Sequence, residues 1–173
     1  MGKKVISFTL DTKDIDKAIR ELEKYKIDFQ KKVDNYRNRL AEEIAVNASL
    51  NFGSAVLDDR VKGEPRKPDV TVSVSDKGNI SVVVADGEDA IWCEFGAGVY
   101  HNGAVGTSPN PYGNDLGFTI GSYGKGYGKA KAWGYYEDGE LVITRGTPAS
   151  MPMYNAVQEV TKRAIEIARE VWK

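Results

Sequence analysis

Near the N-terminus, apolar residues recur every three or four positions, which is the period of an amphipathic α-helix. Asp11 or Thr12 precedes this repeat and is suited to cap the first turn. The pattern predicts a helical region over residues 11–52, either unbroken or divided near Lys26 to Asp28 into a short and a longer helix. A short strand is predicted before it, over residues 5–10. The helical stripe comprises Ile15, Ile19, Leu22, Tyr25, Phe29, Val33, Tyr36, Leu40, Ile44, Ala48 and Phe52.

A β-hairpin is predicted in the middle of the chain, where β-forming residues lie on both sides of a turn. Its strands are Val70 to Val74 and Ile80 to Val84, and Asp76-Lys77-Gly78-Asn79 joins them. The second strand is more continuously apolar, so we expect it to be the more buried of the two. Residues 53–69 form a loop before the hairpin, and residues 70–95 comprise the hairpin and the segment that follows it.

A second hairpin is predicted over residues 133–147. Its strands are Tyr135 to Glu137 and Leu141 to Thr144, and Asp138-Gly139 between them has the composition of a tight turn.

The last part of the chain, residues 150–173, is predicted to be a helix. Ser150 is suited to cap it, and Pro152 is tolerated in a first helical turn. Its apolar stripe comprises Val157, Val160, Ala164, Ile167 or Ala168, and Val171. The order of elements predicts one α+β domain over residues 1–173, in which the long N-terminal helix and the C-terminal helix pack on one antiparallel β-sheet.

Residues 96–132 form an insertion rich in glycine and tyrosine between the two hairpins. Its central part, Gly121 to Lys129, interleaves tyrosine, lysine and glycine. Stacking aromatic rings and cations can hold single-stranded nucleic acid without reading its sequence, although the positive charges here are few. The insertion is therefore interpreted as a flexible surface loop, as a loop that a partner subunit orders, or as a nucleic-acid contact.

Length, net charge and cysteine content restrict the classes of protein to which the chain can belong. A chain of 173 residues suits one domain that buries a core without metals or disulfides. The formal net charge of −1 provides no overall attraction to nucleic acid or to anionic membranes. Cys93 is the only cysteine, which excludes an intramolecular disulfide and favours a reducing compartment. The first residues lack the apolar run of a signal peptide and no segment is apolar enough to span a membrane, so we expect a cytoplasmic protein.

Residues of the types that commonly act in catalysis or bind metals are few in this chain. His101 is the only histidine, and a metal site would need further histidine or cysteine ligands. Cys93 lies among apolar residues and is interpreted as a small buried hydrophobe. Glu94 is a candidate general acid, but it has no partner carboxylate at a suggestive spacing. The glycines do not match phosphate-binding or dinucleotide-binding spacings. We expect no catalytic residue, no metal and no cofactor.

Three short parts of the chain share their order and composition with a known family. They are Glu94-Phe95-Gly96-Ala97-Gly98, then Ala132-Trp133-Gly134-Tyr135-Tyr136, and finally Thr144-Arg145-Gly146-Thr147-Pro148-Ala149 with Met151-Pro152-Met153-Tyr154-Asn155-Ala156. Together with the long helix before a β-hairpin, they make the chain resemble the neck or minor tail-component family of long-tailed phages and prophages. Genes of that family lie between the head-closure and tail-tube genes.

The resemblance implies a structural virion protein that is not an enzyme. Its copies would form a ring at the neck, complete the tail and join it to the filled head. Its partners would be further copies of itself and the neighbouring neck and tail proteins. Genome DNA would pass through the ring without specific binding, and the protein would be found in the host cytoplasm during assembly and then in the virion. The alternative is a cytoplasmic module that holds single-stranded nucleic acid through the Tyr/Lys/Gly tract.

Five aromatic or charged residues are candidates for contacts in such an assembly. Phe95 and Trp133 stand at the two roots of the insertion and are predicted to be packing anchors. Tyr135, Tyr136 and Arg145 are predicted to form a surface between the core and an interface, with ordinary sheet packing as the alternative.

Overall fold

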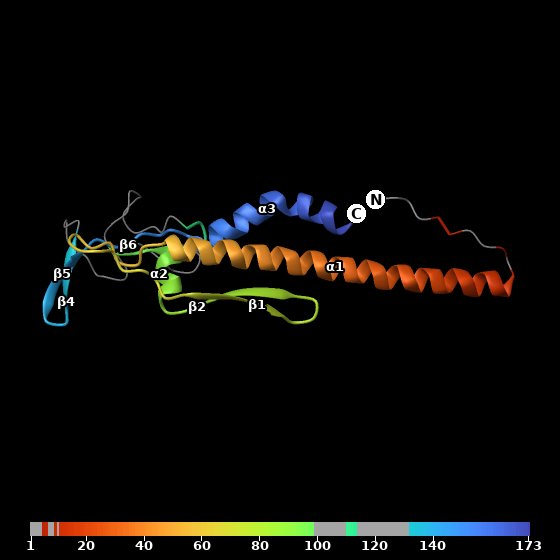
Figure 1. Cartoon of the computed structure of the whole chain (residues 1–173), viewed down its shortest axis with the longest axis horizontal. Coiled ribbons are helices and arrows are strands. Elements are labelled where there is room, and N and C mark those ends of the chain that lie inside the picture. The colour runs from red at the N-terminus through yellow and green to blue at the C-terminus, as the bar shows by residue number, and fades with distance from the viewer. Residues whose placement is uncertain (1–4, 7–8, 10, 99–109, 114–131) are drawn as a thin grey trace.

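The structure is a computed structural model that describes residues 5–6, 9, 11–98, 110–113 and 132–173, without the side chains of Ala97, Gly98 and Trp133. Figure 1 shows an elongated molecule in which α3 lies along one side of α1 and the β1–β2 hairpin lies along the other. This arrangement confirms the predicted α+β class. In chain order the elements are α1 (Thr12–Ser54), β1 (Thr71–Asp76), β2 (Ser81–Asp86), α2 (Asp89–Phe95), β3 (Ala97–Gly98), β4 (Trp133–Glu137), β5 (Glu140–Thr144), β6 (Gly146–Thr147) and α3 (Pro152–Val171).

The long helical region is one unbroken helix of 43 residues, so the alternative with a break near Lys26 is wrong. At about 1.5 Å per residue, α1 is roughly 65 Å long. Most of its buried residues are alanines, whose small side chains let α3 and the hairpin approach closely. The buried residues of α1 are Ala18, Ala41, Ala45, Ala48 and Phe52.

The predictions for the two ends of the chain need correction. Of the strand predicted over residues 5–10, the described residues Val5, Ile6 and Thr9 belong to no strand, and the other residues lie outside the described part. The C-terminal helix is confirmed, but the residue at its N-cap position is Met151, with a φ of 52°, and not Ser150. The hydroxyl of Ser150 instead donates a hydrogen bond to the carbonyl oxygen of Cys93, at 3.4 Å.

α3 packs on α1 through the predicted stripe, except that Ala156 takes the place of Val157. The buried apolar side chains of this face are Ala156, Val160 and Ile167. Val157, which was expected in the stripe, is 39% exposed. Near the end of α3, the hydroxyl of Tyr36 donates to the carbonyl oxygen of Ala164 at 3.1 Å, and the ring of Tyr36 packs edge-on against Trp172. The part of α1 before Tyr36 extends beyond the end of α3 (Figure 1).

β1 and β2 form the first predicted hairpin, in which Thr71 lies opposite Asp86 and Asp76 lies opposite Ser81. The second strand is the more buried, which confirms that prediction. Arg37 of α1 joins the turn end of the hairpin to the helix. Its guanidinium donates to the hydroxyl of Ser81 at 3.0 Å and forms an ion pair with Asp76 at 3.3 Å.

The described strands form three separate two-stranded antiparallel sheets, where one sheet was expected. β4 and β5 form the second predicted hairpin, and β3 pairs with β6. The unpredicted helix α2 follows β2 after a short turn and separates the first hairpin from the later strands. Gly87 in this turn has a φ of 135°, and a Cβ at this position would collide with the carbonyl oxygen of Asp69. The β4–β5 hairpin consequently lies beyond the C-terminal end of α1, away from β1 and β2 (Figure 1).

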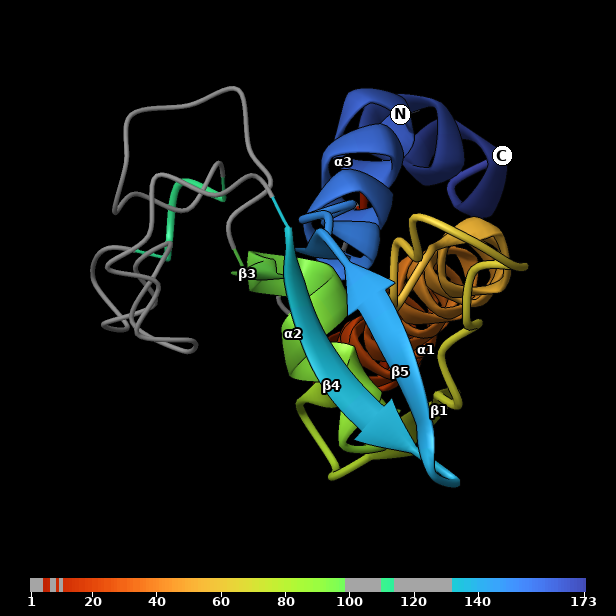
Figure 2. The same ribbon diagram turned by 90° about the vertical axis from the view of Figure 1, so that its left-hand side faces the viewer.

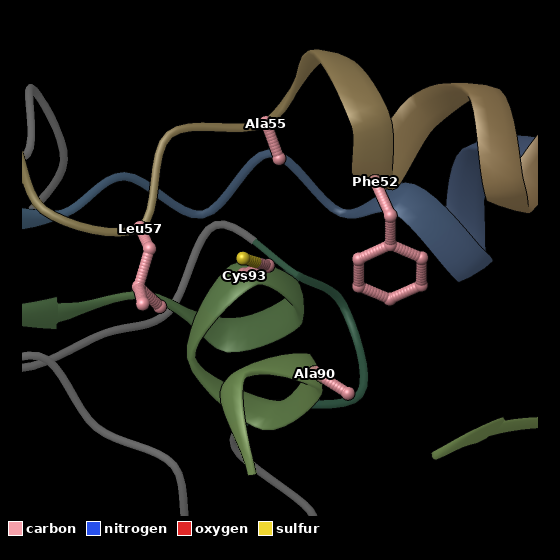
Figure 3. Packing of buried hydrophobic residues seen from close by; sticks show 5 residues of the cluster. All are labelled: Phe52, Ala55, Leu57, Ala90 and Cys93. Atoms are coloured by element: carbon pink, nitrogen blue, oxygen red, sulfur yellow. The ribbon is translucent and has the colours of Figure 1, made fainter. Parts of the chain in front are cut away.

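A cluster of buried apolar residues lies where the C-terminal end of α1 meets α2. Figure 3 shows its members, which are Phe52, Ala55, Leu57, Ala90 and Cys93. Cys93 has no exposed surface. Burial, together with the nearby carboxylates of Asp89 and Glu94, raises the pKa of its thiol to about 11. The prediction that Cys93 is a small buried hydrophobe is therefore confirmed.

Candidate functional site

Two of the three parts that carry the family resemblance meet at one place, which we call the junction. The junction consists of Glu94 at the end of α2, the strands β3 and β6, and the first turn of α3. In the strand pair, Ala97 lies opposite Thr147 and Gly98 lies opposite Gly146. Gly96 and Gly146 have φ values of 80° and 96°, which L side chains rarely adopt. Figure 2 views the molecule from this end, with the β4–β5 hairpin in front of α2.

Glu94 caps α3 from outside that helix. Its Oε2 accepts the backbone N–H of Met153 at 2.8 Å, and its Oε1 accepts that of Tyr154 at 3.0 Å. The first N–H groups of a helix have no partner within the helix, and Met151 at the N-cap makes no side-chain cap hydrogen bond. The positive end of the helix dipole also favours a carboxylate at this point. Glu94 therefore fixes the position of α3 relative to α2.

Asn110 connects the insertion to the same carboxylate. Asn110 is only 2% exposed, and its side-chain amide donates to Oε1 of Glu94 at 2.9 Å. Its own Oδ1 accepts the N–H of Tyr112 at 3.0 Å, which is an Asx-turn. The ring of Tyr112 packs edge-on against Tyr154, with 6.0 Å between the ring centroids. The turn over residues 110–113 is thereby attached to both α2 and α3.

The environment of Glu94 favours a structural role over catalysis. Burial raises the pKa of Glu94, and the hydrogen bonds from Met153, Tyr154 and Asn110 act in the opposite direction. A raised pKa is also found in general acids. In Glu94, however, both carboxylate oxygens already accept N–H groups of the protein. Oε1 accepts two N–H groups, so a proton on this oxygen would displace one of them.

A second polar group attaches the β4–β5 hairpin to the loop after α1, and we call it the Asp58 cluster. Asp58 accepts hydrogen bonds from the hydroxyl of Tyr135 at 2.6 Å, from the guanidinium of Arg60 at 3.0 Å and from the hydroxyl of Thr144. Arg60 also forms an ion pair with Glu137 at 2.8 Å. Burial acts to raise the pKa of Asp58, but the hydrogen bonds from Thr144, Tyr135 and Arg60 outweigh burial and lower this pKa.

The structure places the five predicted contact residues in different environments. Phe95 is half-buried at the end of α2, whereas the side chain of Trp133 lies outside the described part. Tyr135 belongs to the Asp58 cluster, and Arg145 forms an ion pair with Asp59 at 3.3 Å, so both hold the hairpin to the loop. Tyr136 lies on the other face of β4 and is 76% exposed.

Two residues that organise these contacts, Asp58 and Asn110, were not singled out from the sequence. Asn110 begins an Asn-Pro-Tyr-Gly segment, which is typical of a turn and was the available signal. Asp58 lies in a charged loop, and nothing in the local pattern distinguishes it from its neighbours. His101 and the Gly121 to Lys129 tract lie outside the described residues.

Two further findings concern the described part of the chain alone. Its histidine, cysteine, aspartate and glutamate side chains form no group of three or more that could hold a metal ion. None of its helices combines the length and the apolar composition that crossing a membrane requires.

Large apolar side chains lie exposed at both ends of the molecule. On the N-terminal half of α1 they form a row that we call the stripe, and it consists of Ile19, Leu22, Tyr25 and Phe29. On the β4–β5 hairpin they form what we call the hairpin face, which consists of Tyr136, Leu141 and Ile143. Gly134 lies beneath this face, where a Cβ would be 3.1 Å from Cδ1 of Ile143 and 3.2 Å from Cδ1 of Leu141. The glycine thus lets both side chains lie flat across the strand.

Comparison with known proteins identified no relative of this chain. The chain matches no family model, no curated protein and no solved structure.

Proposed function

We propose that the protein is a structural component of a tailed phage or prophage, which acts without catalysis in the neck or tail-completion ring. The observation that carries this proposal is the stripe. A helix of 43 residues presents four large apolar side chains on its N-terminal half, each between 43 and 56% exposed. Contiguous apolar patches of this kind on a folded protein mark sites of interaction with other proteins. An assembly subunit leaves such surfaces open until its neighbours dock.

The hydrogen bonds and ion pairs of the junction support the same proposal. The segments that resemble the phage family contain polar groups that are occupied within the chain. Glu94 caps α3 and binds Asn110, and Arg145 is paired with Asp59. These contacts hold α2, α3 and the root of the β4–β5 hairpin together, and this hairpin lies at one end of the molecule, where it can contact a neighbouring subunit (Figure 1).

The positions of the exposed surfaces also suit a subunit that lies between others. The stripe and the hairpin face lie near opposite ends of the elongated molecule (Figure 1). A protein in a neck contacts other copies of itself as well as the components above and below. Two apolar surfaces that far apart permit both kinds of contact at the same time.

The experiment is to measure the mass of the purified full chain by size-exclusion chromatography with light scattering. The measurement is made on the chain alone and after addition of the portal-side and tail-side proteins that are encoded beside it. We expect a defined multiple of the chain mass, or a complex with one of these partners, and we expect the protein in purified virions. A protein that stays monomeric with every partner and is missing from virions would contradict the proposal.

A further inference from the structure

We propose that neighbouring copies join by seating the stripe of one copy in a groove between α1 and β1 of the next. This inference rests on the proposed function, because it assumes that copies assemble, and it names the two surfaces through which they do so. The groove has a volume of about 380 Å³, and we call it the α1–β1 groove. Its lining consists of Ala45, Val46, Ser49, Leu50 and Val72.

The stripe continues the face of α1 that α3 covers farther along. Phe29 and Tyr25 lie about two and three helical turns before Tyr36, so all three residues are on the same side of α1. The ring of Tyr36 packs against Trp172, the C-cap residue that directly follows α3. Tyr25 and Phe29 stack on each other with 6.3 Å between their ring centroids. The stripe is therefore a convex ridge of the kind that packs well on a helix, and α3 stops short of it.

The α1–β1 groove lies on the side of α1 that faces the first hairpin. Val46 and Leu50 are one helical turn apart on α1 and are 59% and 68% exposed, so much of their surface is still open to a partner. Val72 of β1 lines the groove from the hairpin. The hydroxyl of Ser49 already donates to the carbonyl oxygen of Ala45, at 2.8 Å. An apolar partner can therefore fill the groove without leaving this hydroxyl unpaired.

The two surfaces lie in opposite halves of α1, the stripe at residues 19–29 and the groove at residues 45–50, where β1 flanks the helix. A contact between a ridge and a groove that are different parts of one chain is heterologous, so each copy still offers one free surface to the next copy. Repetition of this contact closes into a ring when the rotation allows it. Contact between two stripes would be symmetric, would stop at two copies and would leave Leu50 exposed. A second copy of this chain is thus the occupant that supplies ridge and groove in equal number.

The exposed area is adequate for such a contact. The four side chains of the stripe are each roughly half exposed, and a large side chain buries about 150–250 Å², so the stripe presents on the order of 350 Å². On the groove side, Val46 and Leu50 are 59% and 68% exposed and add roughly 200 Å², which gives about 550 Å² of apolar surface in all. Because interfaces are only about 57% apolar, the whole contact would bury about 1,000 Å², which is the size of a weak specific interface.

Cysteine pairs test this contact in the full-length chain. Phe29→Cys places a thiol on the stripe and Leu50→Cys places one in the α1–β1 groove. The native Cys93 is fully buried and its raised pKa disfavours the reactive thiolate, so it contributes little background. The two variants are co-expressed with different tags and treated with a short thiol-specific cross-linker. We expect a covalent dimer that carries both tags, and we expect its loss when either variant is present alone.

A matched control replaces the stripe position by one on the opposite side of α1. Lys24 is exposed and faces away from the stripe, so Lys24→Cys with Leu50→Cys should give no dimer. Leu22→Cys with Val46→Cys is a second test pair in case one variant of the first folds poorly. Cross-linking of Phe29→Cys to itself would overturn the inference in favour of a symmetric contact. If the protein forms an oligomer but neither test pair cross-links, the inferred contact is wrong and the proposed function still stands. If the chain stays monomeric with all neck and tail proteins, the proposed function is contradicted as well.

Discussion

Oε2 of Glu94 lies 2.8 Å from the backbone nitrogen of Met153, so the last turn of α2 supplies the cap for the first turn of α3. The capping residue and the capped turn are far apart in the sequence, with the insertion and the second hairpin between them. Both helices therefore depend on one contact, and so does the turn that Asn110 begins. Disturbing the carboxylate should weaken all three together.

Replacing Glu94 tests this dependence directly. Glu94→Gln removes the charge and one acceptor, so we expect the free energy of unfolding to fall by about 1 kcal/mol, as for the loss of a helix cap. Glu94→Ala also leaves the buried amide of Asn110 unpaired, which costs about 1–3 kcal/mol more. Urea unfolding followed by circular dichroism measures both variants. Glu88→Gln is the control, because Glu88 is exposed and makes no cap hydrogen bond, and an equal loss in this control would refute the capping role.

The contact between Glu94 and Asn110 can be isolated by a double-mutant cycle. Asn110→Ala removes the amide that donates to Oε1 of Glu94. We expect the double variant with Glu94→Ala to be more stable than the sum of the single effects predicts, by about 0.5–2 kcal/mol. Urea unfolding of the four proteins gives this coupling energy. Asp58 belongs to the other polar cluster, so the effects of Asn110→Ala and Asp58→Asn on the free energy of unfolding should be additive. If the effects of Asn110→Ala and Glu94→Ala are additive too, the contact between these two residues is refuted.

The Asp58 cluster should make stability depend on pH in the acid range. Hydrogen bonds lower the pKa of Asp58 in the folded protein, so the folded state binds this proton less readily than the unfolded chain does. The resulting stabilisation is fully present above the unfolded pKa of about 3.9 and is lost as the pH falls through the folded pKa. We expect Asp58→Asn to be less stable at neutral pH and to lose less stability on acidification than the wild type. Thermal unfolding at a series of pH values measures this, and parallel pH profiles for the two proteins would contradict it.

A charge in the stripe should prevent assembly without unfolding the subunit. Phe29 is 43% exposed in the isolated chain, so Phe29→Glu should leave the circular dichroism spectrum unchanged. A buried aromatic anchor contributes about 2 kcal/mol or more to an interface, so association should weaken at least about tenfold. Light scattering over a range of protein concentrations measures the change. Lys24→Gln, which alters the net charge by the same amount on the other side of α1, should keep the wild-type mass, and a Phe29→Glu variant that also keeps it would exclude the stripe as an interface.

The nucleic-acid alternative has its own measurement. The chain carries a formal net charge of −1, so we expect labelled single-stranded oligonucleotides to show no binding at low salt. Fluorescence anisotropy is the readout, and a basic single-stranded-DNA-binding protein serves as the positive control. Binding that weakens steadily as salt is added would support the alternative and would direct attention to residues 121–129.

The periodic elements could be predicted from the sequence, and the short or non-local ones could not. The apolar repeat from Ile15 to Phe52 predicted a long helix, and the turn residues at Gly78 and Gly139 predicted both hairpins, because these signals are local. α2 was missed because its seven residues are too few for periodicity to distinguish a buried helix from a strand. The single sheet was a wrong prediction because strand partners depend on where α2 directs the chain.

The residues that organise the candidate site were not predicted from the sequence. The segments around Glu94, Gly146 and Pro152 meet in the structure, which no sequence pattern had indicated. The hydrogen bonds that join these segments connect side chains to backbone groups far away in the sequence. Such hydrogen bonds cannot be predicted from a repeat or a spacing in the sequence. Glu94 was accordingly weighed as an acid for catalysis, whereas its geometry gives it a capping role.

The pairing of β3 with β6 has a consequence for how this protein can vary. Because Gly98 lies opposite Gly146, the polypeptide departs from the scaffold and returns to it at one point. The entropy cost of closing such an excursion rises by only about 0.6 kcal/mol for each doubling of its length. Changes of length between Gly98 and Trp133 that keep the turn over residues 110–113 should therefore leave α1 and α3 as they are. The same place would accept a grafted peptide, which makes it a natural entry point for engineering.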